Sequence, residues 1–203
     1  MKQKKLLKIV ILLGSVVVLS SFAFFYINRT KKMKFGNNSS SQEIINNILN
    51  ISSYETKIEV DVNSNKNANK YIIKQKYVAP DISEQEVLEP KNIEGIKIVK
   101  NKNELKVENT KMNLIKIYND YEYMTDNCLD LNAFIEDYKI MGKEIYEDKD
   151  NEIILTIENK SEKYHKNRTL YISKETGKPT KMEIKDNNKK TLIYILYKEV
   201  EFK

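Results

Sequence analysis

The fold is decided by the last stretch of the chain, Thr169–Lys203, which reads TLYISKETGKPTKMEIKDNNKKTLIYILYKEVEFK. Apolar and charged residues alternate around Met182 and Ile184, the period of a half-buried strand. Turn signals at Thr176–Pro179 and Asp186–Asn188 divide the stretch into three segments. We therefore predict three antiparallel strands, which need further strands or a helix to cover their apolar face.

Working outward, the clearest strand lies at Tyr54–Val62, where apolar positions alternate with charged ones. Shorter strand patterns precede and follow the middle of the chain, at Tyr71–Tyr77, Ile96–Ile98, Leu105–Val107, Met112–Tyr118, Lys143–Tyr146 and Ile153–Glu158. The acidic stretch Pro80–Pro90, bounded by two prolines, is expected to be a loop. The sequence thus predicts about five strands on each side of a central helix.

Two amphipathic helices are expected to pack on this sheet. Ser41 is the predicted cap of the first, whose apolar residues from Ile44 to Ile51 fall mostly at helical spacing. Asp130 is the predicted cap of the second, whose apolar residues follow the i, i+3, i+4, i+7 pattern; they are Leu131, Phe134, Ile135 and Tyr138. The expected fold class is α+β: a strongly curved antiparallel sheet capped by short helices.

The positive charge of the chain is concentrated at its start. The formal net charge is +6, but eight of the 35 basic residues precede Glu43, the first acidic residue. The remaining 27 basic residues face 29 acidic ones, so the folded part carries no basic excess. A nucleic-acid-binding domain needs a basic face of its own, and we therefore expect no nucleic-acid partner.

An uncharged run from Ile9 to Ile27 is long enough to cross the hydrocarbon core of a membrane. A cleaved signal peptide with a site near Ser21–Ala23 competes with this interpretation, but apolar residues continue past that site, which favours an uncleaved anchor. The expected anchor residues are Ile9, Val10, Ile11, Leu12, Leu13, Val16, Val17, Val18, Leu19, Phe22, Phe24, Phe25 and Ile27. The expected organisation is therefore an anchor (residues 1–33), a flexible linker (34–42) and an extracytoplasmic domain (43–203), held at the cell membrane by a single span.

Residues able to carry chemistry are scarce. The chain has one histidine, His165, and one cysteine, Cys128, too few for a structural zinc site with four nitrogen or sulfur ligands. The five glycines are scattered and form no phosphate-binding loop. We expect no catalytic residue, no metal and no cofactor, and hence no enzyme.

Tyrosine is abundant, with 13 copies, and three of them cluster before the second helix: Tyr118, Tyr121 and Tyr123. Tyrosine combines apolar area with a polar tip, which suits both sheet faces and protein interfaces. Ordinary strand packing is one interpretation of this cluster, and a partner-binding surface is the other.

Several of these features together resemble the LolA/LolB-type lipoprotein-carrier superfamily. They are the helix before the first strand, Pro90 followed by Ile96–Val99 and the turn at Asn101, and the closing hairpin Leu170–Pro179. The resemblance implies a half-open β-barrel capped by helices over about residues 43–203. Within the superfamily, the anchored, Lys- and Asn-rich form resembles the germination lipoproteins of spore-forming clostridia (GerS type), although no cysteine lies near the end of the apolar run. That branch implies a non-catalytic partner of a cortex peptidoglycan amidase.

Three functions follow as hypotheses. The first is a non-catalytic, membrane-anchored binding protein outside the cytoplasm, with a cell-wall amidase as its partner in a spore envelope. The second is a carrier of lipid or lipoprotein acyl chains in the curved sheet, which the anchor at Ile9–Ile27 disfavours because a carrier must shuttle. The third is an envelope sensor that signals through the anchor.

Overall fold

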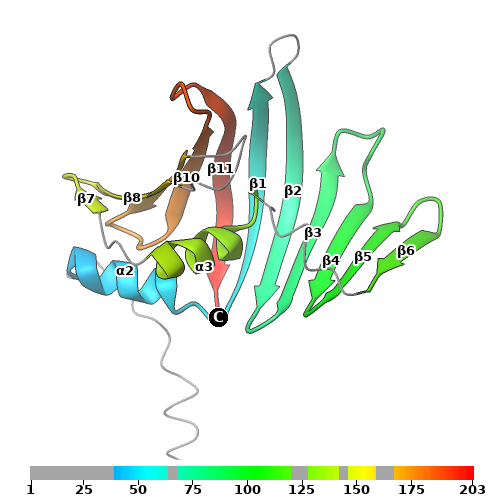
Figure 1. Cartoon of the computed structure of the whole chain (residues 1–203), viewed down its shortest axis with the longest axis horizontal. Coiled ribbons are helices and arrows are strands. Elements are labelled where there is room, and N and C mark those ends of the chain that lie inside the picture. The colour runs from blue at the N-terminus through cyan, green and yellow to red at the C-terminus, as the bar shows by residue number, and fades with distance from the viewer. Residues whose placement is uncertain (1–38, 64–67, 120–127, 142–145, 159–166) are drawn as a thin grey trace, which may run out of the picture. The chain divides into compact units, whose positions relative to one another are not determined.

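A single antiparallel sheet forms the framework in the computed structural model, which describes residues 39–63, 68–119, 128–141, 146–158 and 167–203 (Figure 1). Eleven strands lie within these residues, together with the two helices α2 (Ser41–Leu49) and α3 (Leu131–Met141). The strands are β1 (Ser53–Asn63), β2 (Ala68–Val78), β3 (Ile82–Glu89), β4 (Ile96–Asn101), β5 (Glu104–Asn109), β6 (Leu114–Tyr118), β7 (Tyr146–Asp148), β8 (Glu152–Glu158), β9 (Asn167–Ser173), β10 (Pro179–Lys185) and β11 (Thr191–Phe202).

The sheet is built from two meanders that meet at its centre. The strand order is β6-β5-β4-β3-β2-β1-β11-β10-β9-β8-β7, and all neighbours pair antiparallel. The closing stretch Thr169–Lys203 forms most of β9, then β10 and β11, as predicted, and β11 pairs with β1 in the register Ile58 opposite Tyr197. Among the described residues, one sheet of eleven strands therefore forms the framework of the domain, and the strands at its two ends are β6 and β7.

The strand β1 has the predicted alternation. Tyr54, Ile58 and Val60 are buried, whereas Glu59 between them is exposed. We call the side of the sheet to which these buried residues point the helix-facing face, because α2 and α3 cover it, and the opposite side the outer face (Figure 1). The register carries this assignment from strand to strand across the whole sheet.

The expected loop at Pro80–Pro90 is instead the strand β3, so this prediction was wrong. Both prolines lie just outside the strand, where their missing amide donors cost the ladder nothing. Between them Gln85 is buried on the helix-facing face, while Glu84 and Glu86 lie on the outer face. The alternation was therefore present, but a buried polar glutamine concealed it.

The two helices begin at identifiable caps. Ser40, not the predicted Ser41, caps α2, since its hydroxyl accepts a hydrogen bond from the Glu43 amide at 3.2 Å. Asp130 caps α3 as predicted, because its carboxylate accepts from the Asn132 amide at 3.0 Å. The caps set where each helix starts and hence which side chains it turns toward the sheet.

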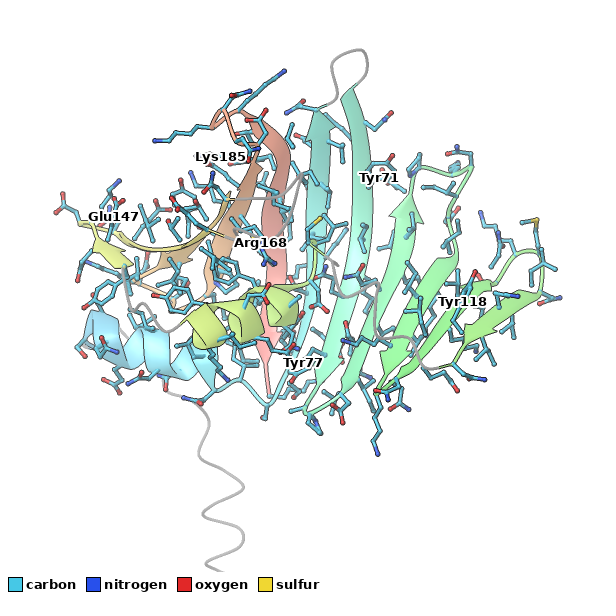
Figure 2. All side chains as sticks on the ribbon, in the orientation of Figure 1. Tyr71, Tyr77, Tyr118, Glu147, Arg168 and Lys185 are labelled. Carbon is cyan, nitrogen blue, oxygen red and sulfur yellow. The ribbon has the colours of Figure 1, made fainter. Side chains whose placement is uncertain are left out.

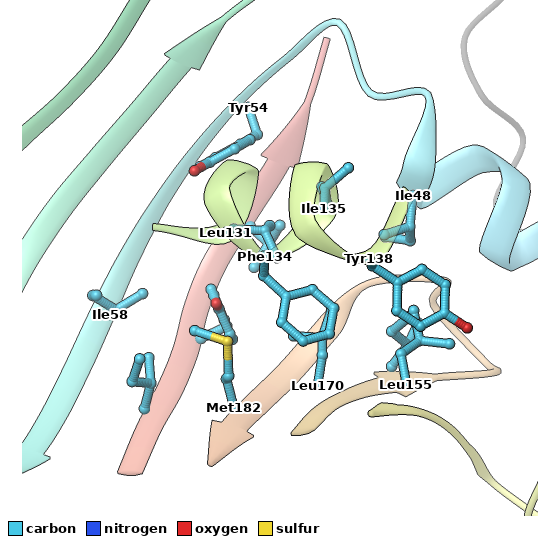
Figure 3. Close-up of a cluster of buried hydrophobic side chains, with 14 of the residues drawn as sticks. Ile48, Tyr54, Ile58, Leu131, Phe134, Ile135, Tyr138, Leu155, Leu170 and Met182 are labelled. Atoms are coloured by element: carbon cyan, nitrogen blue, oxygen red, sulfur yellow. The ribbon is translucent and has the colours of Figure 1, made fainter. Parts of the chain in front are cut away.

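The core lies between these helices and strands β1 and β8–β11. From α3, Leu131, Phe134 and Tyr138 point toward sheet residues that include Leu155, Leu170 and Met182 (Figure 3). Ile44 and Ile48 of α2 complete the layer, and all of these side chains are almost fully buried. The helix-facing face of this half of the sheet is thus filled by the chain's own side chains.

A buried carboxylate joins α3 to the other half of the sheet. Asp130 accepts hydrogen bonds from the Tyr54 hydroxyl of β1 and the Ser83 hydroxyl of β3, both at 2.7 Å. Next to it, the side-chain amide of Gln75 on β2 donates to the Leu129 carbonyl at 2.8 Å. Burial and the nearby Asp130 carboxylate raise the pKa of Tyr54 well above its usual value, and the same causes raise the pKa of Tyr197.

These two tyrosines predict a loss of stability in strong alkali. Their pKa values are raised in the fold, whereas in the unfolded chain they return to about 10. The unfolded chain therefore loses protons first, and stability falls as the pH rises above about 10. In an absorbance titration near 295 nm, Tyr54 and Tyr197 should ionise only when circular dichroism reports unfolding. Titration of all 13 tyrosines near pH 10 in a chain that stays folded would contradict the burial.

A buried arginine forms a second polar link between sheet and helix. Arg168 of β9 lies between Ile157 and Ile184 on the helix-facing face, and its side chain is only 2% exposed. Its guanidinium pairs with the Asp137 carboxylate of α3, which is 37% exposed. The charge that cannot reach water is thus the arginine, and its partner is the more solvated group.

Neither α2 nor α3, the helices among the described residues, has the length and apolar character needed to cross a membrane. The expected anchor, Ile9–Ile27, lies outside the described residues. The compact unit that holds the sheet lies within Phe35–Lys203.

Candidate functional site

The strand β6 is the least covered element of the sheet. Within the part of the chain that the structure describes, it pairs with β5 alone, and all five of its residues are exposed. Four of the five are apolar or aromatic, and Met112 in the preceding turn adds a further apolar side chain. These side chains are between 43% and 62% exposed; they are Met112, Leu114, Ile115, Ile117 and Tyr118. We call this set the open edge, and contiguous exposed apolar side chains of this kind mark interaction sites.

The backbone of the open edge is available as well. Thr110 donates its amide to the Gly95 carbonyl, so alternate residues of β5 starting from Thr110 point toward β4. The register between β5 and β6 then turns the main-chain amides and carbonyls of Leu114, Lys116 and Tyr118 toward β5. The amides and carbonyls of Ile115 and Ile117 consequently point away from the sheet, ready to pair with an added strand.

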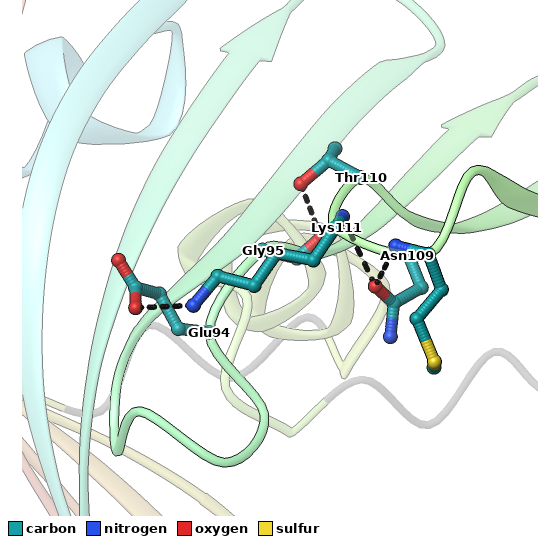
Figure 4. A network of polar contacts seen from close by, with 6 residues as sticks. Glu94, Gly95, Asn109, Thr110 and Lys111 are labelled. Atoms are coloured by element: carbon teal, nitrogen blue, oxygen red, sulfur yellow. Dashed lines mark hydrogen bonds and ion pairs between the residues drawn. The ribbon is translucent and has the colours of Figure 1, made fainter.

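The turn before β6 holds the open edge in position. The side-chain oxygen of Asn109 accepts hydrogen bonds from the amides of Lys111 and Met112, at 3.2 and 3.1 Å (Figure 4). The Lys111 ammonium lies 2.6 Å from the Glu94 carboxylate and lowers the pKa of that group. Gly95 has φ +84°, and an added Cβ would lie 2.5 Å from the Thr110 hydroxyl oxygen. The hairpin is therefore anchored at three points and presents β6 as a defined strand.

The opposite edge of the sheet is protected. The strand β7 has three residues, and two of them are the acidic Glu147 and Asp148. Asp148 pairs with the Lys174 ammonium and accepts a 2.6 Å hydrogen bond from the Ser41 hydroxyl, and these contacts lower its pKa. Short length and charge are the means by which proteins discourage pairing at an edge. Glu147 and Tyr118 mark these two unlike edges at opposite ends of the sheet (Figure 2).

Of the predicted partner surface, the structure places Tyr118 in the open edge, 43% exposed and with the Lys116 ammonium 5.6 Å from its ring centre. Tyr121 and Tyr123 lie outside the described residues, as do His165 and the anchor residues from Ile9 to Ile27. Cys128 is partly buried against the core, two residues before Asp130. Within the described ranges, no three His, Cys, Asp or Glu residues gather as a metal site.

The sequence pattern predicted β6 as a strand, but of the five residues of the open edge only Tyr118 was predicted to lie in a partner surface. The missed signal is the absence of a polar face. In β1 every second residue is polar, whereas in β6 apolar residues occupy both parities, with Leu114 and Tyr118 on one face and Ile115 and Ile117 on the other. A strand that is apolar on both faces must either be covered twice or serve as an interface.

Comparisons with known proteins show the fold. No family model matches the sequence, and no curated protein sequence is similar to it. Among solved structures, the chain is similar to one from the complex of the CwlD amidase with the GerS lipoprotein of Clostridioides difficile. The TM-score is 0.53 at 24% identity, over 82% of this chain and 98% of that one.

Two further solved structures are similar to the chain. One is an uncharacterized conserved protein from Thermus thermophilus, with a TM-score of 0.50 at 13% identity, over 81% of this chain and 88% of that one. The other is the LolA superfamily protein NE2245 from Nitrosomonas europaea, with a TM-score of 0.41 at 13% identity, over 81% and 94%. The fold is LolA-like, as the resemblance in the sequence predicted.

Proposed function

We propose that this chain is a non-catalytic binding protein, anchored in the cell membrane, whose domain outside the cytoplasm engages another protein through the open edge. The observation that carries the proposal is β6, which leaves both its apolar side chains and its outward backbone groups uncovered. A partner that adds a strand there gains main-chain hydrogen bonds and buries apolar area in the same contact.

A cell-wall amidase is the partner class we propose. The similar lipoprotein from Clostridioides difficile was solved in complex with the CwlD amidase, and this chain covers nearly all of that relative's length. The proposal places this chain in the same kind of complex, with the amidase supplying the chemistry. This division of labour agrees with a sequence that holds a single histidine and a single cysteine.

The alternative function, transport of acyl chains, is less well supported by the packing. In a carrier the helix-facing face must receive the lipid, but between the helices and strands β8–β11 that face is filled. Phe134 and Leu131 of α3 are 0% exposed, and Ile48 of α2 is 0% exposed. An acyl chain in this half of the sheet would have to displace these side chains and break the hydrogen bonds of Asp130 that hold the start of α3.

Co-purification tests the proposal directly. The full chain is expressed with the CwlD-type amidase of the same genome and extracted from the membrane fraction in detergent. The double variant Ile115→Lys with Ile117→Lys replaces two apolar side chains of the open edge with charged ones. It should reduce the recovered amidase at least about tenfold, because charges then stand where the complex would bury apolar contacts. Intact mass should show that residues before Ala23 are retained, as an uncleaved anchor requires.

The matched control is Ile140→Lys on α3, which replaces an isoleucine that is 81% exposed and remote from β6 in the fold. This variant should recover as much amidase as the unmodified chain, and circular dichroism should be the same for all three proteins. An amidase that never co-purifies, or one that the double variant still recovers in full, would refute the proposal.

A further inference from the structure

The charges of the β3–β6 half of the sheet are sorted between its two faces. All residues of these four strands are described, and their register assigns each to a face. On the helix-facing face the only charged residues are two lysines, Lys100 of β4 and Lys116 of β6. The carboxylates of these strands lie on the outer face, where they form ion pairs with lysines of that face, Lys97 with Glu84 and Lys106 with Glu108.

Lys116 therefore has no acidic neighbour on its own face of these strands. Its ammonium lies 5.6 Å from the ring centre of Tyr118, on the same face of β6. The residues beside it on the neighbouring strands are the uncharged Val107 and, beyond that, Ile98. Lys100 lies in line with Tyr118 across β5, so the described residues of β3–β6 contribute only positive charge to the helix-facing side of the open edge.

The backbone geometry defines which residue of an added strand meets Lys116. Ile115 and Ile117 would form the hydrogen-bonded pairs with an antiparallel strand, so Lys116 between them occupies a non-hydrogen-bonded pair. Side chains in such a pair approach each other most closely, with Cα atoms about 4.5 Å apart. The neighbouring positions of the added strand would lie against Ile115 and Ile117 on the outer face.

We propose that the segment bound at the open edge is an extended strand in which acidic and β-branched apolar residues alternate. Its carboxylates lie on the helix-facing face, opposite Lys116. This inference rests on the proposed function and specifies the chemistry of the partner's segment. A carboxylate opposite Lys116 would pair with its ammonium, and Val or Ile opposite Ile115 and Ile117 would bury these two exposed isoleucines on the outer face. A basic strand would instead place two ammonium groups in the closest pair of the interface.

Two synthetic heptapeptides test the inference on the full chain in detergent. Both have blocked ends and alternate valine with a charged residue, glutamate in one and lysine in the other. The acidic peptide should bind about tenfold more tightly than the basic one, a ratio that higher salt reduces because these charges are exposed. Hydrogen exchange followed by mass spectrometry should show new protection in residues 112–119, because binding pairs the outward amides of Ile115 and Ile117.

A charge reversal makes the test independent of folding defects. The variant Lys116→Glu should bind the basic peptide better than the acidic one, and this gain cannot come from an unfolded protein. The control is Lys106→Glu, which reverses a lysine of the adjacent strand on the outer face and should retain the preference for the acidic peptide. Equal binding of both peptides to the unmodified chain, or an unchanged preference in Lys116→Glu, would overturn the inference.

The outcomes also separate this inference from the proposed function. If the amidase complex depends on Ile115 and Ile117 but the peptides bind without a charge preference, the acidic strand is wrong and the proposed function stands. If the acidic peptide binds at residues 112–119 but no amidase complex forms, the acidic-strand inference stands and the proposed amidase partner is wrong. A concentration-dependent dimer that disappears in the Ile115→Lys, Ile117→Lys variant would assign the edge to a second copy of the chain and overturn the acidic-strand proposal.

Discussion

Ile58→Asp is expected to lower the free energy of unfolding by about 3–5 kcal/mol, because it removes a buried apolar side chain and places a carboxylate in the core. Ile58 is 0% exposed and lies at the centre of the sheet, between Tyr197 of β11 and Ile73 of β2. Urea denaturation followed by circular dichroism measures the loss, and Val60→Asp should behave in the same way.

The control for this prediction is the adjacent residue. Glu59 lies on the outer face with its side chain 47% exposed, and its carboxylate is 3.8 Å from the Lys198 ammonium. Glu59→Lys therefore removes one exposed ion pair and should cost about 0.5 kcal/mol. Similar losses for Ile58→Asp and Glu59→Lys would mean that the register of β1 is wrong.

The second large effect concerns the pair of Arg168 and Asp137, and it should be strongly asymmetric. Asp137→Ala should cost about 3 kcal/mol, because it leaves a guanidinium that is 2% exposed without its carboxylate. The Nε atom of Arg168 is already buried without a hydrogen-bond partner, so the site has little capacity to compensate. Arg168→Met should cost only about 1 kcal/mol or less, since the remaining Asp137 carboxylate is partly exposed to water.

The double variant completes this experiment. Asp137→Ala combined with Arg168→Met removes both charges, and we expect it to be about as stable as Arg168→Met alone, because no charge remains buried. Chemical denaturation of the four proteins gives the coupling free energy of the pair. Additive losses in the double variant would show that the arginine does not depend on Asp137 for its burial.

The sequence predicted the elements whose polarity alternates and missed those in which burial and polarity disagree. The strand β1 was recognised because its buried and exposed residues differ in chemistry. The strand β3 was taken for a loop, since its buried centre is the polar Gln85. Arg168 shows the same difficulty, because a buried charge is explained only by Asp137, which lies 31 residues away in the sequence and across the layer in α3.

The functional surface posed a different problem. Tyr118 was singled out because of its residue type, but the open edge depends on which strand ends the sheet. Strand order arises from the pairing of β1 with β11, the first and last strands of the chain, which places β6 at one end and β7 at the other. Such a long-range pairing leaves no local signature, so the sequence could identify β6 as a strand and not as an edge.

The difference between the two edges determines the stoichiometry of any complex that forms by strand addition. A sheet that could pair at both ends would join copies or partners in succession and grow into a fibre. Here the described part of β7 has three residues and its Asp148 is engaged by Lys174 and Ser41, so among the described strands β6 is the edge suited to strand pairing. Under the proposed function the chain is therefore a monovalent adaptor: one bound strand saturates it, and association by this route ends at one partner for each copy.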